Sequence, residues 1–439
     1  MSLRAEIPGN FDLFDLHRRD PAAYPFLLQS VAGHPVSGRY DILFAFPQQA
    51  LVLTGRVNFF EELSKQFAAE PADTNPDLPF CGGWFLYLGY EAARQVESSL
   101  TLPRSPHRWP DAFAVRCPAA AIFDHERQLV HLFAERDESQ LERLRSDLQH
   151  DFRNDLQDHE NKIVESVNPD EPQRFLGGVR RILDYLSAGD TFQVNLSRGW
   201  RARLVRGTDY QVLYARLRQR NPAPFAGLAC WNGSAVLSSS PERLVSVAGN
   251  VVETRPIAGT RPRALGEIED RAQQRHLIGS LKERAEHVML IDLERNDLGR
   301  ICEPGSIEVN ELMTVESYAH VHHIVSNVRG RLRPETGPGE VLRAIFPGGT
   351  ITGCPKVRAM EIIAELEGTG RGPYTGAMGY LSRCGRMDTN ILIRSLICED
   401  GMVSFRAGAG IVADSVPEAE LAETNAKARG VLLALGAVA

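Results

Sequence analysis

Short apolar runs separated by polar loops dominate the first part of the chain, a pattern typical of β-strands joined by turns. The composition then changes, and charged and polar residues predominate between Ser139 and Pro172. This stretch predicts a solvated helix and then a linker that ends at Pro169 and Pro172. We therefore expect an N-terminal region over residues 1–165 and a second region over residues 170–439. The predicted N-terminal strands are Tyr40–Phe46, Gln49–Thr54, Phe80–Tyr90, Ala112–Phe123 and Leu129–Phe133, the last two forming a pair.

Beyond that boundary, strands alternate with amphipathic helices. Phe175, Val179 and Ile182 recur at helical spacing. The segment Gly348–Leu366 begins with glycines and threonines and turns through Pro355 into a helix. Such a loop is either an ordinary helix start or, because it presents free N–H groups beside a helix dipole, a receptacle for an anion. Further helices are predicted around residues 283–297 and 418–435, and further strands at residues 191–200, 235–240, 251–260, 376–381, 390–397 and 405–413.

Composition excludes several classes of protein. A hydrophobic content of 43% and a charged content of 24% are ordinary for a globular protein. The net charge of -7 and the lack of a Lys/Arg block argue against nucleic-acid binding. No apolar run is long enough to span a bilayer, and the N-terminus has no apolar core typical of a secretory signal. Seven scattered cysteines without a CxxC pair predict reduced thiols, so we expect a cytoplasmic protein without membrane attachment.

Two predicted helices each carry a pair of glutamates three residues apart. Glu283 and Glu286 form one pair, and Glu420 and Glu423 form the other. An i, i+3 spacing places both carboxylates on one helical face, where they repel each other unless a cation neutralises them. Each pair alone is typical of a solvated helix surface. Two pairs facing each other would instead suit a hard divalent cation such as Mg²⁺, and the apolar residues beside these glutamates favour partial burial.

Other residues could hold an anionic substrate. Arg394 lies in an otherwise apolar strand, and a buried arginine requires an anionic partner, whether a carboxylate of the protein or a ligand. Lys427 follows Glu423 by one helical turn, so a helix ion pair is the simple alternative to a substrate contact. His323 is a candidate acid or base, although a histidine in a strand is more often structural. Tyr380 and the glycines of the AGAG stretch could supply a hydroxyl and close backbone approach.

Taken together, eight motifs resemble the chorismate-utilising enzymes, which include anthranilate synthase component I, aminodeoxychorismate synthase component I, and the isochorismate and salicylate synthases. The motifs are PIAGTRPR, RAEHVMLIDLERND, HHIVS, FPGGTITGCPKVRAMEII, GAMGY, MDTNILIRS, AGAGIVADS and EAELAETNAKAR. They run in family order over residues 190–430, and the N-terminal part matches more loosely. The resemblance implies one intertwined α+β fold in which two stacked antiparallel sheets are surrounded by helices.

The resemblance also implies the residues of the site. Glu286 and Glu423 would bind Mg²⁺, with Glu420 and Glu283 assisting through water. The carboxylates of chorismate would be held by Tyr380, Arg394, Lys427 and the backbone of Ala409 and Gly410. The reacting ring would be lined by Gly259, Thr260, His323 and Thr350; of these, His323 and Thr350 are expected to be catalytic, together with Glu283.

One position bears on the nucleophile. Isochorismate and salicylate synthases carry a water-activating lysine in the strand that here reads TFQVNLS, and this chain has Gln193 there. The choice therefore narrows to the two ammonia-using enzymes. Because the chain has no GxCxGHQ-like glutaminase motif, a separate glutamine amidotransferase subunit is the expected partner.

Two local features favour different products. Ala258 stands where many aminodeoxychorismate synthases carry the lysine of PIKGT, and anthranilate synthases also have alanine there. Asp41, however, replaces the serine of the tryptophan-feedback signature, and Leu27–Ser30 depart from its LLES part, as in aminodeoxychorismate synthases. We expect the folate-branch product, 4-amino-4-deoxychorismate. Anthranilate synthase is the alternative, and a binding paralogue without activity is a third, which the retained Glu286, His323, Arg394, Glu423 and Lys427 oppose.

Overall fold

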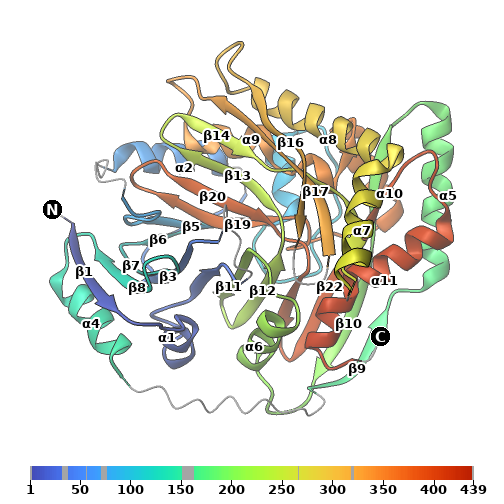
Figure 1. The fold of residues 1–439 in the computed structure, drawn as a ribbon. Helices are drawn as coiled ribbons and strands as arrows, with labels where there is room; N and C mark the ends of the chain where they lie inside the picture. The colour runs from blue at the N-terminus through green and yellow to red at the C-terminus, as the bar shows by residue number, and fades with distance from the viewer. Residues whose placement is uncertain are drawn as a thin grey trace.

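Two antiparallel β-sheets stacked face to face form the centre of the molecule, and helices cover their outer faces (Figure 1). The structure is a computed structural model that describes residues 2–31, 38–55, 57–70, 77–150, 163–264, 266–317 and 321–437. Within these residues the sheets have 12 and 10 strands. This arrangement confirms the expected α+β class with two stacked antiparallel sheets.

The larger sheet mixes strands from both ends of the chain. Its order is β1 (Leu3–Pro8), β8 (Leu129–Ala134), β7 (Ala119–Asp124), β3 (Tyr40–Ala45), β2 (Phe26–Gln29), β11 (Phe225–Trp231), β12 (Ser234–Ser240), β21 (Ser395–Glu399), β22 (Met402–Ile411), β10 (Gln193–Leu204) and β18 (Gly353–Cys354). The strand β9 (Val164–Pro169) also pairs with β10.

The smaller sheet is mixed in the same way. Its order is β15 (Ile257–Pro262), β17 (Val321–Arg331), β14 (Val251–Thr254), β13 (Arg243–Ala248), β20 (Met387–Ile391), β19 (Ala377–Ser382), β5 (Gly83–Leu88), β6 (Ala112–Cys117) and β4 (Ala50–Val52). The strand β16 (Glu308–Ser317) also pairs with β17.

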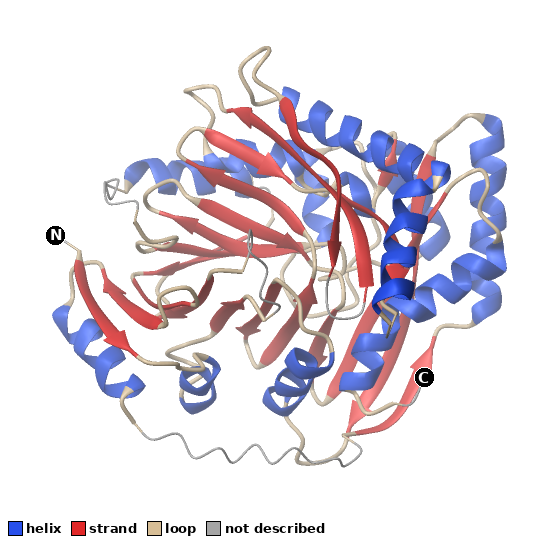
Figure 2. Cartoon of the chain, in the orientation of Figure 1, coloured by secondary structure: helices blue, strands red, loops and turns tan. Residues whose placement is uncertain are grey.

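Helices pack on the outer face of each sheet (Figure 2). The larger sheet is covered by α1 (Phe14–Arg19), α4 (Glu138–Leu148), α6 (Tyr210–Arg220) and α11 (Pro417–Ala434). The smaller sheet is covered by α2 (Phe59–Ala69), α8 (Leu281–Gly299) and α9 (Pro338–Ile345). The helix α10 (Lys356–Glu367) packs on β10 and β18 of the larger sheet. The remaining helices are α3 (Ala93–Val96), α5 (Pro172–Ala188) and α7 (Glu267–Gly279), with short 3-10 turns η1 (Tyr90–Ala92) and η2 (Gly349–Ile351). Among the described helices, none combines the length and apolar character that crossing a membrane requires.

Aromatic side chains fill the space between the sheets. Phe26 from the larger sheet stacks on Phe85 from the smaller one, with ring centroids 4.1 Å apart. Phe44 meets the edges of Phe80 and Phe85 at 4.9 Å and 5.4 Å. Such pairs stabilise the fold by about 0.5–1.5 kcal/mol each beyond the burial of their area. The inward-facing positions of the predicted strands thus form the central core, as their apolar pattern requires.

Three details differ from the predicted elements. The run at residues 112–123 is two strands, because Pro118 separates β6 in the smaller sheet from β7 in the larger one. Only β7 pairs with β8, as expected. The segment expected to be a linker forms β9 at Val164–Pro169, and residues 151–162 of that stretch lie outside the described residues. The predicted strand at residues 390–397 is interrupted before Ser395, since Arg394 has a positive φ of 50°.

Both predicted regions contribute to both sheets. β2 of the N-terminal region pairs with β11, and β5 pairs with β19. The division into residues 1–165 and 170–439 stays a prediction about chain organisation. The two regions share one central core, so the sheets themselves do not follow that division.

Two places where the chain passes between the sheets lie side by side. One passage joins β12 to β13, and the other joins β20 to β21. They are hydrogen-bonded to each other: the Ser239 N–H donates to the Arg394 carbonyl oxygen at 3.3 Å, and the Ile391 N–H donates to the Glu242 carbonyl oxygen at 3.0 Å. This double passage holds an acidic and a basic side chain, Glu242 and Arg394, next to the central core.

Candidate functional site

The four glutamates predicted from their spacing lie in the first two turns of two helices, α8 and α11. Ser280 caps α8, since its hydroxyl accepts a hydrogen bond from the Glu283 N–H at 3.3 Å. Pro417 occupies the first turn of α11, where its missing N–H costs nothing. The positive end of each helix dipole therefore lies close to its carboxylates.

The structure brings three of these carboxylates toward one place. The Gln193 amide of β10 donates to Glu286 at 2.8 Å. The Glu283 carboxylate lies against Gly259, where a Cβ atom would stand only 2.9 Å from it. Gly259 has a φ of +66° and forms an irregularity in the pairing of β15 with β17, so the close approach depends on glycine. Glu423 forms an ion pair with Lys427 at 2.7 Å.

The carboxylates affect one another's ionisation. Burial, followed by the negative charges of Glu283 and Glu423, raises the pKa of Glu286 to about 7. Glu420 is buried, and its pKa is also raised, first by burial and then by the charge of Glu423, against a hydrogen bond from Ser415. A cluster with this surplus of negative charge is stabilised by a cation.

The donor set fits magnesium chemically. Mg²⁺ prefers oxygen ligands, usually binds one or two protein carboxylates, and keeps several water molecules. Among the described residues, no group of three or more His, Cys, Asp or Glu side chains is arranged to hold a metal by itself. Glu286 and Glu423 can thus supply at most part of a coordination shell, which substrate and water would complete.

Glu242, which the sequence analysis did not select, is the other acid of the site. It is 5% exposed, and the Thr350 hydroxyl of η2 donates to its carboxylate at 2.8 Å. Burial raises the pKa of Glu242 to about 7, against the opposing effects of Thr350, Lys427 and Arg394. The sequence contains only a weak signal: Glu242 and Arg243 directly follow the predicted strand at residues 235–240 and a proline.

His323 of β17 is part of the same cluster. Its Nδ1 lies 3.0 Å from the Thr260 hydroxyl and 3.2 Å from the Gly259 carbonyl oxygen. Burial, together with the positive charges of Arg394 and Lys427, lowers the pKa of His323 to about 3. The imidazole is therefore neutral at physiological pH, and it can accept a proton or hydrogen-bond but does not begin as a cationic acid.

One edge of β22 faces this cluster. β21 pairs with β22 only as far as Phe405, so among the described residues Arg406–Ile411 pair with β10 alone. Lys427 donates to the Gly408 carbonyl oxygen at 3.1 Å, on the stretch that also contains Ala409 and Gly410. The role of the Ala409 and Gly410 backbone in holding a carboxylate stays a prediction.

Tyr380 is not among the residues that the structure brings together. Its ring packs between the sheets, 6.0 Å from the ring of Phe80 and 6.4 Å from that of Phe44. Tyr374 lies beside Lys427 instead: a Cβ atom at Gly408 would stand 2.7 Å from the Tyr374 hydroxyl. The stretch PYTGAMGY contains both tyrosines, and its pattern does not distinguish them.

A separate buried ion cluster supports the strands of the site. Glu367 accepts from Arg371 at 2.7 Å, from Arg406 at 3.0 Å and from the Ser197 hydroxyl at 2.7 Å. The Arg371 side chain also donates to the Asn195 carbonyl oxygen at 2.7 Å. Although burial acts to raise it, these two arginines hold the pKa of Glu367 below its usual range. The cluster joins α10 to β10 and β22, and its carboxylate is fully engaged by donors of the protein itself.

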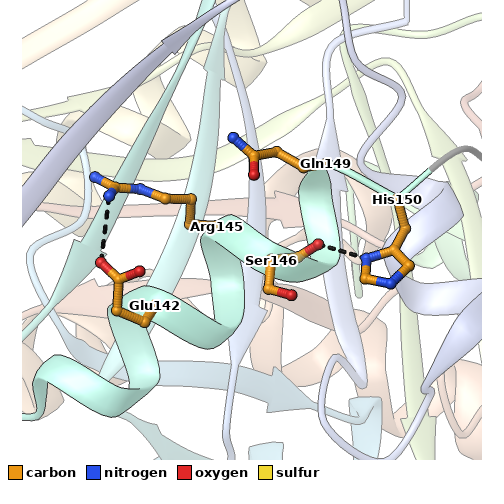
Figure 3. A pocket seen from close by; sticks show the side chains of 5 residues that line it. All are labelled: Glu142, Arg145, Ser146, Gln149 and His150. Carbon is orange, nitrogen blue, oxygen red and sulfur yellow. Dashed lines mark hydrogen bonds and ion pairs between the residues drawn. The ribbon is translucent and has the colours of Figure 1, made fainter.

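A surface pocket at α4 lies elsewhere (Figure 3). It is lined by Glu142, Arg145, Ser146, Gln149 and His150. The Arg145–Glu142 ion pair and the His150–Ser146 contact link its own lining residues. Because α4 packs on β1, β7 and β8, this pocket is at the opposite end of the larger sheet from β10 and β22.

Comparison of the sequence with known protein families identifies one that matches. The description "chorismate binding enzyme" matches residues 26–433, nearly the whole chain. The chain belongs to the chorismate binding enzyme family. The family match includes all the site residues described above, from Gln193 to Lys427.

Relatives of this chorismate binding enzyme have two different names. Aminodeoxychorismate synthase component 1 of Escherichia coli is 38% identical over 440 residues, covering 95% of each chain. Anthranilate synthase component 1 of Streptomyces coelicolor is 42% identical over 447 residues, covering 93% of this chain and 83% of its own. Sequence identity alone therefore does not decide the product.

Solved structures support the fold. Anthranilate synthase component I from Streptococcus pneumoniae has a TM-score of 0.81 and 32% identity, covering 91% of this chain and 93% of its own. MenF, the menaquinone-specific isochorismate synthase of Escherichia coli, has a TM-score of 0.76 at 17% identity, covering 99% of this chain and 95% of its own. The second likeness concerns the fold alone.

Proposed function

We propose that this chain is component I of an aminodeoxychorismate synthase, which aminates chorismate with ammonia from a separate glutamine amidotransferase subunit. The observation that carries the proposal is Glu242, a buried acid with a pKa near 7, held by Thr350 beside two cations. Chorismate is a dianion with a poor leaving group, its C4 hydroxyl. The cations can neutralise the two negative charges, and a protonated carboxyl group can donate a proton to the leaving hydroxyl.

The cations and the backbone edge would bind the substrate. Arg394, Lys427 and the Gly410 backbone would hold the substrate carboxylates; Arg394 and Lys427 both act on the charges of Glu242 and His323, and the Tyr374 hydroxyl lies beside Lys427. Glu286 and Glu423 would hold Mg²⁺, and Glu283 and Glu420 would bind its water ligands. When bound, the metal would neutralise a substrate carboxylate and help to orient the ring.

The proton balance can be written with residues of this chain. Glu242 donates its proton to the leaving hydroxyl, which departs as water while ammonia forms the new C–N bond. The ammonium group so formed returns one proton to the Glu242 carboxylate. Neutral His323 and Thr260 line the ring and can accept hydrogen bonds from the incoming nitrogen.

Gln193 supports ammonia as the nucleophile. Its amide is hydrogen-bonded to Glu286 and cannot act as a base toward water, unlike a lysine at that position. Free ammonia is scarce near neutral pH, so a glutaminase subunit would supply it. We further propose that the enzyme works in the cytoplasm, where its thiols remain reduced.

The Asp41 network supports the folate branch. Asp41 accepts from the Gln29 amide at 3.0 Å and from the Ser30 N–H at 2.8 Å, and it lies 2.9 Å from the His125 ring. The two stretches that depart from the tryptophan-feedback signature are therefore bonded to each other. This network is the structural reason for preferring the folate branch over a tryptophan-regulated enzyme.

Product analysis tests the proposal. The chain is incubated with chorismate, Mg²⁺ and ammonium, and the products are separated by chromatography with and without an aminodeoxychorismate lyase. A pyruvate-bearing product that yields 4-aminobenzoate only with the lyase is expected. Anthranilate without the lyase would refute the branch, and no Mg²⁺-dependent turnover would favour a binding paralogue.

Anthranilate synthase is the second candidate because of Ala258. This residue is 6% exposed and pairs with Ile324, so no lysine is available at that place for covalent attack. Ala258→Lys separates the two candidates. The variant should remain active if amination at C4 is native, whereas in an anthranilate synthase the added lysine should trap or divert the ring.

The expected partner has its own test. The chain should use glutamine only after a glutaminase subunit is added, and turnover of glutamine by the chain alone would refute the need for that partner.

A further inference from the structure

Two cysteines flank the paired ends of β5 and β19: Cys81 lies just before β5, and Cys384 lies just after β19. The antiparallel pairing of these strands places Ser382 opposite Gly83, and the Arg383 N–H donates to the Gly82 carbonyl oxygen at 2.9 Å. The strands end at this point: Cys81 lies two residues before the first residue of β5, and Cys384 lies two residues after the last residue of β19, in the turn that follows. A disulfide requires Cα atoms roughly 4.4–6.8 Å apart, so the two cysteines have to lie close together beyond the paired residues.

A shared hydroxyl holds the two cysteines together. The Cys384 thiol donates to the Ser382 hydroxyl at 3.3 Å, and that hydroxyl accepts from the Cys81 N–H at 3.0 Å. The Arg4 guanidinium of β1 lies 3.8 Å from the Cys81 sulfur. Three segments far apart in the sequence therefore meet at this thiol pair.

The chemistry of Cys384 differs from that of the cysteines that have no such neighbour. The pKa of Cys384 is lowered to about 6, first by its hydrogen bond with the Cys81 thiol and then by Ser382 and Arg386. Burial raises the pKa of Cys117 to about 12, and burial also raises the pKa of Cys354. Cys384 is half-buried, so it is also accessible to a small oxidant.

We propose that Cys81 and Cys384 form a redox-active dithiol that a peroxide converts into a reversible intramolecular disulfide. The Cys384 thiolate attacks one peroxide oxygen, giving a sulfenic acid and hydroxide, which takes up the proton lost by the thiol. The Cys81 sulfur then displaces the sulfenic oxygen as water. Two thiols lose two electrons and two protons, and one peroxide becomes two waters. The inference does not depend on the proposed function.

The new bond would join the segment before β5 to the turn between β19 and β20. Both strands lie in the centre of the smaller sheet and contribute to the core between the sheets. Closing such a long loop covalently restricts the unfolded chain, so the oxidised protein should melt at a higher temperature than the reduced protein.

Peroxide treatment of the full-length chain tests the dithiol. After oxidation and alkylation, mass spectrometry should show a loss of two hydrogens, two fewer alkylated thiols and a linked peptide containing Cys81 and Cys384. Dithiothreitol should reverse all three changes. Cys384→Ser should abolish the link, whereas Cys354→Ser, which alters another half-buried cysteine, should retain it.

A second measurement needs no variant. In the reduced wild-type chain at pH 7, iodoacetamide should modify Cys384 roughly tenfold faster than Cys354, because a thiolate is the nucleophile. Sulfinic acid at Cys384 without a link to Cys81, a disulfide between other cysteines, or equal alkylation of Cys384 and Cys354 would each overturn the proposal.

Discussion

Two clusters of charged side chains lie against the paired strands β10 and β22, and they differ in how their charges are balanced. In the first, Glu367 is enclosed by Arg371 and Arg406. In the second, Glu286 has a neutral amide donor, and the neighbouring charges of Glu283 and Glu423 oppose its ionisation. The carboxylate of the first cluster is neutralised within the protein, whereas the second has neighbouring negative charges that a bound cation would neutralise.

The difference separates structural from functional buried charge. A carboxylate whose pKa is lowered by its partners stabilises the fold in its ionised form. A carboxylate whose pKa is raised by burial and by like charges destabilises the fold when ionised, so its retention needs another reason. We propose ligand binding as that reason for Glu286 and proton transfer as that reason for Glu242.

The largest expected effect is the loss of activity in Glu286→Ala and Glu423→Ala. Each variant should lose about 10³-fold or more of its Mg²⁺-dependent turnover, because metal neutralisation supplies several kcal/mol of transition-state stabilisation. Melting temperatures should stay close to wild type, since each substitution removes a charge from a repulsive cluster. Glu361→Ala, on an exposed ion pair of α10, is the control. Near-normal turnover of either variant with Mg²⁺ chelated would show that these residues are not the metal ligands.

The next effect concerns proton donation. Glu242→Gln should lower kcat by about 10²- to 10⁴-fold, because an amide cannot donate the proton that the leaving hydroxyl needs. In the wild type, the protonated form is active and the pKa of Glu242 is about 7, so kcat should fall as the pH rises through 7. Thr350→Val removes a hydrogen bond that favours the ionised form, so it should move this decline to higher pH. An unchanged pH profile in both variants would exclude Glu242 as the acid.

Substitutions in the Glu367 cluster should change the stability of the fold. Glu367→Ala leaves Arg371 buried without its carboxylate and should lower the free energy of unfolding by about 3–5 kcal/mol. Glu267→Ala, which removes an exposed partner of Arg271, should change it by less than about 0.5 kcal/mol. Denaturant unfolding measures both. The lowered pKa of Glu367 also predicts that its contribution is fully present above about pH 4.5 and is lost as the pH falls through the folded-state pKa. Equal losses in the free energy of unfolding for Glu367→Ala and Glu267→Ala would show that the Glu367 cluster does not stabilise the fold.

The smallest effect should come from Gly410→Ala. A Cβ atom there would stand 2.5 Å from the Gln193 amide nitrogen and 3.4 Å from the Glu286 carboxylate. The flexible amide would move and lose its hydrogen bond to Glu286, raising KM roughly fivefold through a loss of about 1 kcal/mol. Gly177→Ala, at a helix position with open space, should leave KM unchanged. A loss confined to kcat would argue against a role in binding.

Start signals predicted the helices of the site better than the apolar pattern predicted where strands break. The helices α8, α10 and α11 are found close to their expected bounds, and each has a clear start signal, namely Ser280, Pro355 or Pro417. The passages at Pro118 and Arg394 were missed, since an apolar run continues through both although the strands on either side belong to different sheets.

Residue roles were predictable only where spacing limits the geometry. The glutamate pairs of α8 and α11 could be found because an i, i+3 spacing defines a helical face. Glu242 was missed because its importance comes from tertiary burial, which a single residue after a strand does not reveal. The choice between Tyr374 and Tyr380 depends on tertiary position, because Tyr380 is in β19 between the sheets whereas Tyr374 is in the turn before β19, beside Gly408 of β22. The catalytic and binding roles themselves stay predictions until the variants are measured.

The passages between the sheets also determine how the protein folds. Each sheet contains strands from both ends of the chain, and β10 pairs with β22, about 200 residues away in sequence. Pairings of such high contact order close large loops before they gain stabilising contacts, so folding should be slow, and its nucleus cannot be confined to one half. A fragment that ends near residue 165 would expose the edge of β2 that β11 covers and would tend to aggregate. The order in which the chain leaves the ribosome therefore matters, because β2 and β5 must wait for strands synthesised much later.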